Sequence, residues 1–415
     1  MSIQLTDEQD SIINLAIKWF NNDSSQTFEL SGSAGTGKSL VLHEIVKRLG
    51  LKDLEYVAAA YTGAAAIVMR RNNFDKASTI HSLLYQFVEG KDPLTGKKVK
   101  HFIWRGVPSF VKLIIIDEAG MCDMNIRRDL ERTGKKILVA GDINQLPPVS
   151  GSQAYFTDTS KVHFLTKIMR QNQDSAIVFL SQALLQGKRL KEGVYGNGEV
   201  IVLPRKEFKE NIEDCIRVYG TILCGMNKTR DELNKLVRED VLGYDNPLPY
   251  IGERLINRKN IWELEIDDGI ALVNGTIGRS LNNVDQSRYR KGMFVIDFKP
   301  DYTRDYFKDL EVDYEYFIAN SNRRKEIKEL VYSDGAKMEY AYACTTHVAQ
   351  GSQFDTGIYY QEYFPKDSNN LHYTGITRFR NKMLFVIPDY RRIYSADTTF
   401  KGYKCDVLIP IEKVK

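Results

Sequence analysis

Hydrophobic runs and amphipathic stretches alternate along residues 1–165. The runs include Thr27–Leu30, Tyr56–Tyr61, Val111–Asp117 and Lys135–Ala140, and the stretches between them have helical periodicity. The centre of the third run, LIII, is typical of a central strand that is buried on both faces. This regular alternation of strands and helices predicts a parallel α/β sheet.

A second α/β pattern begins near Phe164 and includes the runs Thr221–Met226, Met338–Thr345 and Met383–Pro388. Short strand-like runs with Asn-Gly and Lys-Gly turns interrupt it over residues 246–334. That composition predicts a small β-barrel inserted into the second α/β domain.

Alternating hydrophobic residues also flank a Pro- and Gly-containing turn between His81 and Val111. This arrangement predicts a hairpin that projects from the first domain.

Composition limits the class of protein. Hydrophobic residues make up 43% and charged residues 27% of the 415, as in globular proteins. No hydrophobic run approaches the ~20 residues that cross a bilayer, and the first residues, MSIQLTDEQD, are polar, so we expect neither a membrane span nor a signal peptide. The five cysteines form no CxxC pair, which favours reduced thiols in a cytoplasmic protein over disulfides or a zinc site. They are Cys122, Cys215, Cys224, Cys344 and Cys405.

The charge of the protein does not by itself indicate whether it binds nucleic acid. The net charge of +4 and the pI of about 8.5 are only mildly basic. Basic residues cluster at Lys97–Arg105, Arg323–Lys328 and Asp389–Tyr394, and the first and third of these clusters also contain aromatic residues. Such clusters suit single-stranded nucleic acid, but a solvated surface explains each of them equally well.

The segment GSAGTGKS fits the phosphate-binding pattern G-x-x-x-x-G-K-[ST] and lies between a predicted strand and a predicted helix. Its glycines let backbone N–H groups curl around phosphates, Lys38 neutralises the β and γ oxygens, and Ser39 can ligate Mg²⁺. The predicted nucleotide contacts are Gly32, Ser33, Ala34, Gly35, Thr36, Gly37, Lys38 and Ser39.

Two further strands end in polar residues that suit phosphoryl transfer. In LIIIDEAGM, Asp117 is the candidate Mg²⁺ ligand and Glu118 the candidate that polarises the attacking water. In VAGDINQLPPV, Asp142 and Gln145 follow another strand, where an amide can sense the γ-phosphate or hold the attacking water.

These motifs, in this order, resemble a superfamily 1 helicase of the RecD- and Dda-like 5′→3′ branch. The resemblance also covers LTDEQ, IMRQ and YTGITRFR. It implies that Gln9 contacts adenine, that Arg170 reaches the γ-phosphate, and that Arg378 is the arginine finger. It further implies ATP and Mg²⁺ as cofactors.

Other segments resemble the DNA-facing motifs of the branch. YTGAAA and STIHSLL imply Thr62, Thr79 and His81 as contacts, and GMNKTRDELN implies Asn227. LVNGTIG resembles a turn of the inserted SH3-like barrel of this branch. The hairpin corresponds in position to the strand-separating pin of the family, with Phe102 and Trp104 as candidate wedge residues or as simple packing residues.

The stretch TTHVAQGSQFD resembles the fifth motif of the family. Thr345, Thr346 and His347 would face DNA, Gly351 would approach the γ-phosphate, and Gln353 would bind the ribose. Close relatives usually carry Lys where Val348 stands, so one expected charge is missing. One short loop would then touch both the DNA and the nucleotide.

The resemblance implies two tandem RecA-like P-loop domains, with a pin insertion in the first and an SH3-like β-barrel insertion in the second. The expected boundaries are 1–165 for the first domain, with its hairpin at 82–110. Residues 166–248 and 335–415 form the second domain, and residues 249–334 form the barrel.

The predicted function is ATP-dependent unwinding of duplex DNA by a motor that moves 5′→3′ on single strands. Expected partners are single-stranded DNA, its junctions with duplex, and replication or single-strand-binding proteins. The protein would act as a monomer in a bacterial or phage-infected cytoplasm, in replication, recombination or repair. The alternatives are an ATP-switched nucleic-acid-binding protein, a nucleotide kinase and a superfamily 2 helicase.

Overall fold

The computed structural model describes residues 5–91, 98–148, 151–169, 175–266, 270–284, 292–301, 303–330, 335–363, 368–389, 399–400 and 403–404. The chain divides into two compact units, residues 1–172 and 173–415. Among the described residues, none of the helices has the length and apolar character needed to span a bilayer.

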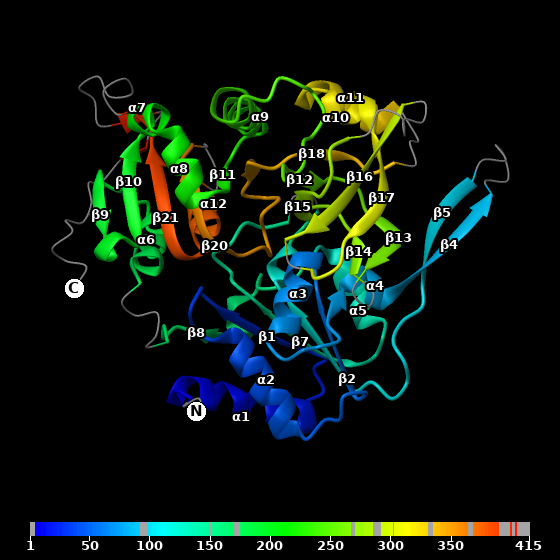
Figure 1. Ribbon diagram of the computed structural model, residues 1–415. Coiled ribbons are helices and arrows are strands. Elements are labelled where there is room, and N and C mark those ends of the chain that lie inside the picture. Colours follow the sequence, from blue (N-terminus) through cyan, green and yellow to red (C-terminus); the bar gives the residue numbers. More distant parts are fainter. Residues whose placement is uncertain are drawn as a thin grey trace. The chain divides into compact units, whose positions relative to one another are not determined.

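The first unit is built on a six-stranded sheet with the strand order β3-β2-β6-β7-β1-β8, and all of its pairings are parallel (Figure 1). The strands are β1 Thr27–Gly32, β2 Tyr56–Ala60, β3 Ser78–Thr79, β6 Leu113–Asp117, β7 Lys136–Gly141 and β8 Val162–Leu165. The helices are α1 Asp7–Asn22, α2 Lys38–Leu49, α3 Gly63–Arg71, α4 Ile80–Leu84 and α5 Met124–Glu131. The predicted parallel α/β sheet is confirmed.

Both faces of this sheet are covered. Leu113 and Ile115 pack into a core with residues of α1, α2 and α3, whereas Ile114 and Ile116 pack into a second core with residues of α4 and α5. All four side chains of this strand have an exposed fraction of 0%. A strand between two helical layers must be hydrophobic at every position, which explains the run LIII.

The predicted hairpin forms in the first unit. Strand β4 Tyr85–Lys91 pairs antiparallel with β5 Lys98–Trp104, with Phe87 opposite Phe102. The turn itself lies outside the described residues. Whether the hairpin separates strands stays a prediction.

The second unit contains another six-stranded sheet, with the order β19-β11-β20-β21-β10-β9. Its strands are β9 Gly193–Tyr195, β10 Val200–Pro204, β11 Ile222–Cys224, β19 Ala343–Thr345, β20 Phe354–Tyr360 and β21 Phe379–Ile387, and only the pairing of β9 with β10 is antiparallel. Its helices are α6 Ala176–Leu185, α7 Arg205–Glu210, α8 Ile212–Tyr219, α9 Asn227–Lys235 and α12 Ser368–Ile376. This is the second RecA-like sheet that the sequence predicts.

An inserted antiparallel sheet has the order β17-β16-β15-β12-β18. Its strands are β12 Arg254–Asn257, β15 Ile277–Ser280, β16 Met293–Pro300, β17 Phe307–Asp313 and β18 Met338–Tyr340. A separate two-stranded sheet, β13 Ile261–Ile266 with β14 Ile270–Leu272, lies between β12 and β15 in the sequence. Two helices, α10 Tyr314–Ile318 and α11 Ser321–Leu330, connect β17 to β18.

The segment before β18 brings the two ends of this sheet together. The backbone N–H of Ala336 donates to the carbonyl of Glu311 at 2.8 Å, and the N–H of Asp313 donates to the carbonyl of Ala336 at 3.0 Å. The same segment continues into β18, which pairs with β12. The strands therefore curl towards a closed barrel, and the sheet uses residues beyond 334. The SH3-like assignment and the domain limits stay predictions.

Candidate nucleotide and nucleic-acid sites

The phosphate-binding loop joins β1 to α2. Gly35 and Gly37 both have φ values of 83°, a left-handed conformation that favours glycine. The Lys38 ammonium donates to the carbonyls of Gly32 at 2.5 Å and Ser33 at 3.3 Å, so it lies inside the curled loop. A Cβ on Gly32 would lie 2.6 Å from the Thr36 hydroxyl oxygen. The loop therefore has the tight backbone that phosphate binding requires.

Gln9 supports this loop from α1. Its side-chain amide donates to the Thr36 carbonyl at 3.0 Å, and its side-chain oxygen accepts from the Thr6 backbone N–H at 3.0 Å. Thr6 returns a bond by accepting from the Gln9 N–H, which completes a capping box at the start of α1. Gln9 is 1% exposed, so its side chain braces the loop in this structure. Its predicted contact with adenine stays a prediction.

The carboxylate motif stands at the carboxyl edge of the same sheet. Asp117 is the last residue of β6, and its carboxylate accepts from the Glu118 N–H at 2.9 Å. Glu118 has a φ of 53°, which is uncommon for a residue other than glycine and occurs often at functional sites. This conformation turns the chain sharply directly after the strand.

The loop after β7, the strand between β6 and β1 in the sheet, is the third polar loop. The N–H of Gln145 donates to the carbonyl of Asp142 at 3.1 Å, which forms a tight turn directly after β7. The N–H of Ile143 donates to the Ser31 hydroxyl at 3.2 Å, so this turn is tied to the strand that leads into the phosphate-binding loop. Gln145 is half-buried in this turn. The predicted catalytic loops of the first unit therefore share one edge.

The residues predicted to hold Mg²⁺ are Ser39, in the first turn of α2, and Asp117. In the part of the chain that the structure describes, no group of three or more His, Cys, Asp or Glu side chains is arranged to bind a metal. Mg²⁺ usually keeps several waters and takes one or two carboxylates besides phosphate oxygens, so one hydroxyl and one carboxylate fit it.

The predicted DNA contacts of the first unit lie at helix starts. Thr62 caps α3 by accepting from the Ala65 N–H at 3.1 Å, and Thr79 caps α4 by accepting from the Ser82 N–H at 3.1 Å. His81 lies in α4, and burial lowers its pKa. Both threonine hydroxyls thus have a structural role, and their contact with DNA stays a prediction.

Trp104 packs at the base of the hairpin. The Arg132 guanidinium lies 4.2 Å from the centre of its ring, and its indole N–H donates to the Asp129 carbonyl at 3.4 Å. A Cβ on Gly106 would lie 2.8 Å from the ring. This environment favours packing over a wedge role for Trp104. The side chain of Phe102 lies outside the described residues.

In the second unit, the loop that follows β19 carries the fifth-motif residues. Strand β11 lies between β19 and β20, and its residue Ile222 pairs with Ala343 of β19 and with Ile358 of β20. Two residues further along both neighbouring strands, Thr345 and Tyr360 therefore lie at the same height in the sheet. Strand β20 begins at Phe354, six residues before Tyr360. At about 3.3 Å per residue, its first residue lies roughly 20 Å from the height of Thr345. The loop therefore runs from the carboxyl edge of the sheet to its amino edge.

The end of this loop that is predicted to face DNA is only partly exposed. His347 is exposed, whereas Thr345 and Thr346 are 5% and 0% exposed. The Thr346 hydroxyl and N–H both donate to the Cys224 carbonyl, at 3.1 and 2.8 Å. The Thr346 hydroxyl thus has a hydrogen-bond partner inside the unit, and its predicted contact with DNA stays a prediction.

The end of the loop that is predicted to face the nucleotide lies at the amino edge of the sheet. Gly351 has a φ of 78°, and Gln353 accepts a hydrogen bond from Arg380, a residue that the sequence did not single out. Arg378 precedes β21, is 4% exposed, and donates from Nε to the Thr374 carbonyl at 3.2 Å. The structure thus brings Gly351, Gln353 and Arg378 to one edge of the second sheet. Arg170 lies outside the described residues.

Asn227 is the exposed first residue of α9, and a buried carboxylate fixes this helix start. Glu362 is 3% exposed and accepts from the N–H groups of Gly225 at 2.7 Å and Met226 at 2.9 Å, and from the Thr229 hydroxyl at 2.5 Å. Sequence reasoning missed Glu362. The signal was an acidic residue just after a hydrophobic run, as at Asp117.

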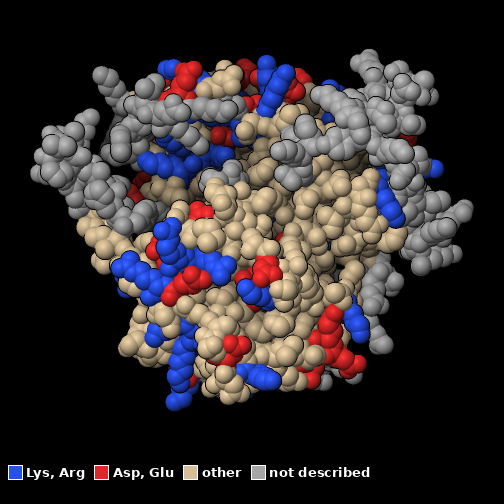
Figure 2. Space-filling model, turned by 180° about the vertical axis from the view of Figure 1, so that it is seen from behind, with Lys and Arg blue, Asp and Glu red and all other residues tan. Residues whose placement is uncertain are grey.

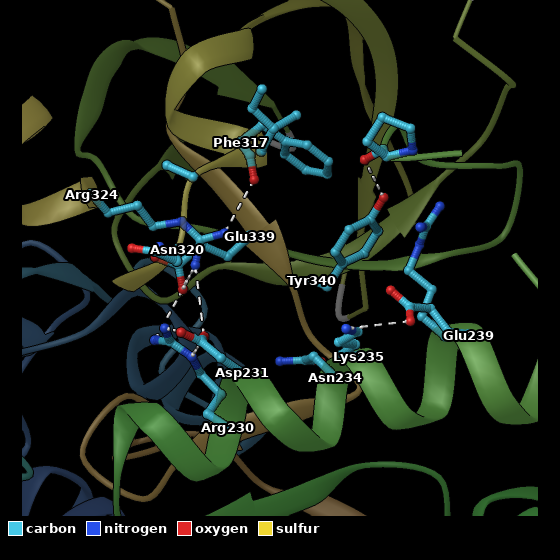
Figure 3. A pocket seen from close by; sticks show the side chains of 14 residues that line it. Arg230, Asp231, Asn234, Lys235, Glu239, Phe317, Asn320, Arg324, Glu339 and Tyr340 are labelled. Carbon is cyan, nitrogen blue, oxygen red and sulfur yellow. Dashed lines mark hydrogen bonds and ion pairs between the residues drawn. The ribbon is translucent and has the colours of Figure 1, made fainter. Parts of the chain in front are cut away.

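A cluster of charged residues joins α9 to the inserted sheet and lines a cavity of about 300 Å³. Figure 3 shows Arg230 and Asp231 on α9 facing Glu339 and Arg324. Arg230 pairs with Glu339 at 3.0 Å and donates to the Asn227 side-chain oxygen at 3.0 Å. Burial alone would raise the pKa of Glu339, but the nearby Arg258, Arg230 and Arg324 hold that pKa below its usual value. The cluster therefore positions Asn227 from the side of the inserted sheet.

Surface charge is distributed in small groups. On the face that Figure 2 displays, Lys and Arg side chains gather in several separate groups with Asp and Glu among them.

Comparisons with known proteins agree with these motifs. A family model described as an AAA domain matches residues 4–201. The RecD2 DNA helicase of Deinococcus radiodurans is 26% identical over 85% of this chain and 46% of its own length. The Pif1 DNA helicase of Campylobacter jejuni is 25% identical over 67% of this chain and 63% of its own length. The chain spans less than two thirds of these curated relatives.

Solved structures share the fold. The structure of a Bacteroides Pif1 bound to single-stranded DNA matches with a TM-score of 0.51 and 18% identity, covering 94% of this chain and 96% of that one. A structure of Pif1 helicases at forked duplex DNA matches with a TM-score of 0.52 over the same shares.

A phosphate-binding loop in one parallel α/β sheet, followed by a second sheet of the same kind, defines a P-loop protein with two RecA-like domains. Together with the matches to RecD2 and Pif1, these features show that the chain is similar to the RecD- and Pif1-like helicases of superfamily 1B. The resemblance drawn from the motifs is confirmed at this level.

Proposed function

We propose that the protein is an ATP- and Mg²⁺-dependent helicase that moves along single-stranded DNA and separates the duplex ahead of it. The names of the matched relatives, ATP-dependent DNA helicases, support this proposal. The 5′→3′ direction comes from the branch of helicases that the chain resembles. We also propose that a monomer works at junctions of single-stranded and duplex DNA, in the cytoplasm, with replication or single-strand-binding proteins as partners.

In this proposal the first unit holds the nucleotide. Backbone N–H groups of the loop Gly32–Gly37 bind the phosphates, Lys38 neutralises their charge, and Glu118 polarises the attacking water while Gln145 orients it. Ser39 and Asp117 would hold Mg²⁺, which supplies positive charge at the phosphate oxygens. Arg170 and Arg378 would stabilise the charge that develops in the transition state.

The observation that carries the proposal is the path of the loop after β19. One segment has His347 at the carboxyl edge of the second sheet, beside the end of β11 that leads to Asn227, and Gly351 and Gln353 at the amino edge. A short loop that carries both sets of residues suits a motor, because hydrolysis and grip must change together. A nucleotide kinase would have no use for the residues that are proposed to face DNA.

Strand displacement on duplexes with a 5′ or a 3′ single-stranded tail tests the proposal, together with ATPase rates with and without single-stranded DNA. A helicase of this branch displaces the strand only with ATP and from the 5′ tail, and single-stranded DNA stimulates its ATPase. Stimulation and binding without displacement would instead support an ATP-switched binding protein. Displacement from the 3′ tail would refute the proposed direction.

A further inference from the structure

A chain of buried polar side chains crosses the core of the second unit. The Tyr359 hydroxyl, in the middle of β20, lies 2.9 Å from His372 Nδ1 in α12 and also forms a hydrogen bond with Thr346. The Thr346 hydroxyl donates to the Cys224 carbonyl at 3.1 Å. Thr346, Tyr359 and His372 are 0%, 0% and 2% exposed. A buried polar network of this kind is costly unless each hydrogen finds an acceptor.

The hydrogens of this chain have one consistent direction. A carbonyl can only accept, so the Thr346 hydroxyl gives its hydrogen to Cys224 and accepts from Tyr359. Tyr359 then accepts from His372, which places the imidazole hydrogen on Nδ1. Among the described residues, the buried Nε2 of His372 has no hydrogen-bond partner, and in this tautomer it is a bare nitrogen rather than an unpaired N–H. Burial also lowers the His372 pKa to about 3, so the ring is neutral.

Packing fixes α12 against the same tyrosine. A Cβ on Gly375 would lie 2.1 Å from a carbon of the Tyr359 ring, so only glycine lets the helix approach this closely. The ring and the hydroxyl of Tyr359 therefore both contact α12, through Gly375 and His372. This double contact sets the position of the helix along β20.

The two ends of the chain reach the two sets of candidate residues. At one end, Thr346 lies between Thr345 and His347, and Cys224 ends the strand that leads to Asn227. At the other end, α12 finishes at Ile376, and the Arg378 guanidinium is bonded to the Thr374 carbonyl of that helix. A displacement of α12 relative to β20 would therefore move Arg378.

We propose that the chain Thr346–Tyr359–His372 positions Arg378 relative to the DNA-facing loop, so that Tyr359 and His372 are positioning residues for DNA-stimulated ATP hydrolysis. The inference rests on the proposed function. It assigns no contact with DNA or nucleotide to either residue.

The test compares ATPase rates with and without single-stranded DNA in Tyr359→Phe, which removes the hydroxyl but keeps the ring on Gly375. Tyr360→Phe is the matched control, because its ring lies in the core on the opposite face of the same strand. We expect stimulation in Tyr359→Phe to fall roughly fivefold, the effect of about one buried hydrogen bond. Its rate without DNA, and both rates of Tyr360→Phe, should stay close to the parent values.

A second pair of variants separates positioning from folding. Asn at position 372 can donate its amide hydrogen to Tyr359 as Nδ1–H does, whereas Leu cannot. We expect His372→Asn to keep most of the stimulation and His372→Leu to lose it, with no further loss when Tyr359→Phe is added to His372→Leu. Thermal melts verify that each variant is folded.

Unchanged stimulation in Tyr359→Phe, or an equal fall of its rates with and without DNA, would overturn the inference. An unmodified protein that single-stranded DNA does not stimulate would instead overturn the proposed function, and the inference with it.

Discussion

The side-chain amide of Gln9 donates a 3.0 Å hydrogen bond to the Thr36 carbonyl, which links the first helix to the phosphate-binding loop. The amide therefore holds the loop from behind, and a Cβ on Gly37 would lie only 2.6 Å from the same nitrogen. Gln9, which the resemblance predicts to contact adenine, thus supports the phosphate-binding loop in this structure.

Gln9→Ala should loosen this loop. We expect KM to rise about tenfold for ATP and for GTP alike, since a buried carbonyl loses its partner at a cost of about 1–3 kcal/mol. Steady-state hydrolysis with both nucleotides measures the effect, with Ser11→Ala on the exposed side of α1 as the control. A rise confined to ATP would show that Gln9 reads the base instead.

Arg378→Ala should lower the rate of hydrolysis by about 10³–10⁵, the range found when an arginine finger is missing. Nucleotide binding, measured by displacement of a fluorescent ATP analogue, should change little. Lys382→Ala removes an exposed cation from β21 and serves as the control. Hydrolysis at the normal rate in Arg378→Ala would refute the finger assignment.

Glu362→Gln should weaken single-stranded DNA binding about tenfold without changing the ATPase rate measured without DNA. An amide replaces a carboxylate that accepts three hydrogen bonds from the start of α9, and charge-assisted bonds contribute roughly 1.5–3 kcal/mol each. Fluorescence anisotropy with a labelled oligonucleotide measures the affinity. Glu232→Gln, on the exposed side of the same helix, should bind like the parent; equal weakening in both variants would point to a general loss of charge.

Trp104→Ala should lower the free energy of unfolding by about 3 kcal/mol, because the ring packs against Arg132 and Gly106 at the base of the hairpin. Ile103→Ala, at a side chain that is 54% exposed, should leave stability unchanged. Chemical denaturation of both variants measures the difference. A Trp104→Ala protein with normal stability and impaired strand displacement would restore the wedge assignment.

His372 should make the protein less stable in acid. The unfolded chain binds a proton near pH 6.5, whereas burial lowers the folded-state pKa to about 3. Above pH 6.5 the ring is neutral in both the folded and the unfolded chain, so its burial costs no free energy of deprotonation. As the pH drops from 6.5 towards 3, the free energy of unfolding falls by up to roughly 5 kcal/mol in total. His372→Asn has no proton to bind, so its denaturation midpoint should fall less over this pH range. Parallel curves for the two proteins would show that the ring is not buried in a neutral form.

The sequence by itself determined the parallel sheets and the nucleotide loop, because both depend on local patterns. The run LIII could only be a strand covered on both faces, and GSAGTGKS requires its glycines wherever it folds. The order of the motifs was sufficient to predict the resemblance to the RecD-like helicases of superfamily 1, and the comparisons find the same similarity.

The tertiary structure alone decided which side chains are used inside the protein. Thr346 looked like a DNA contact, yet its hydroxyl is bonded to Cys224, 122 residues away in sequence. Glu362 and Tyr359 looked like ordinary residues of a strand and its end, yet one holds the start of α9 and the other contacts both Thr346 and His372. Such roles depend on which strands become neighbours in a sheet, and residue spacing along the chain does not specify those distances.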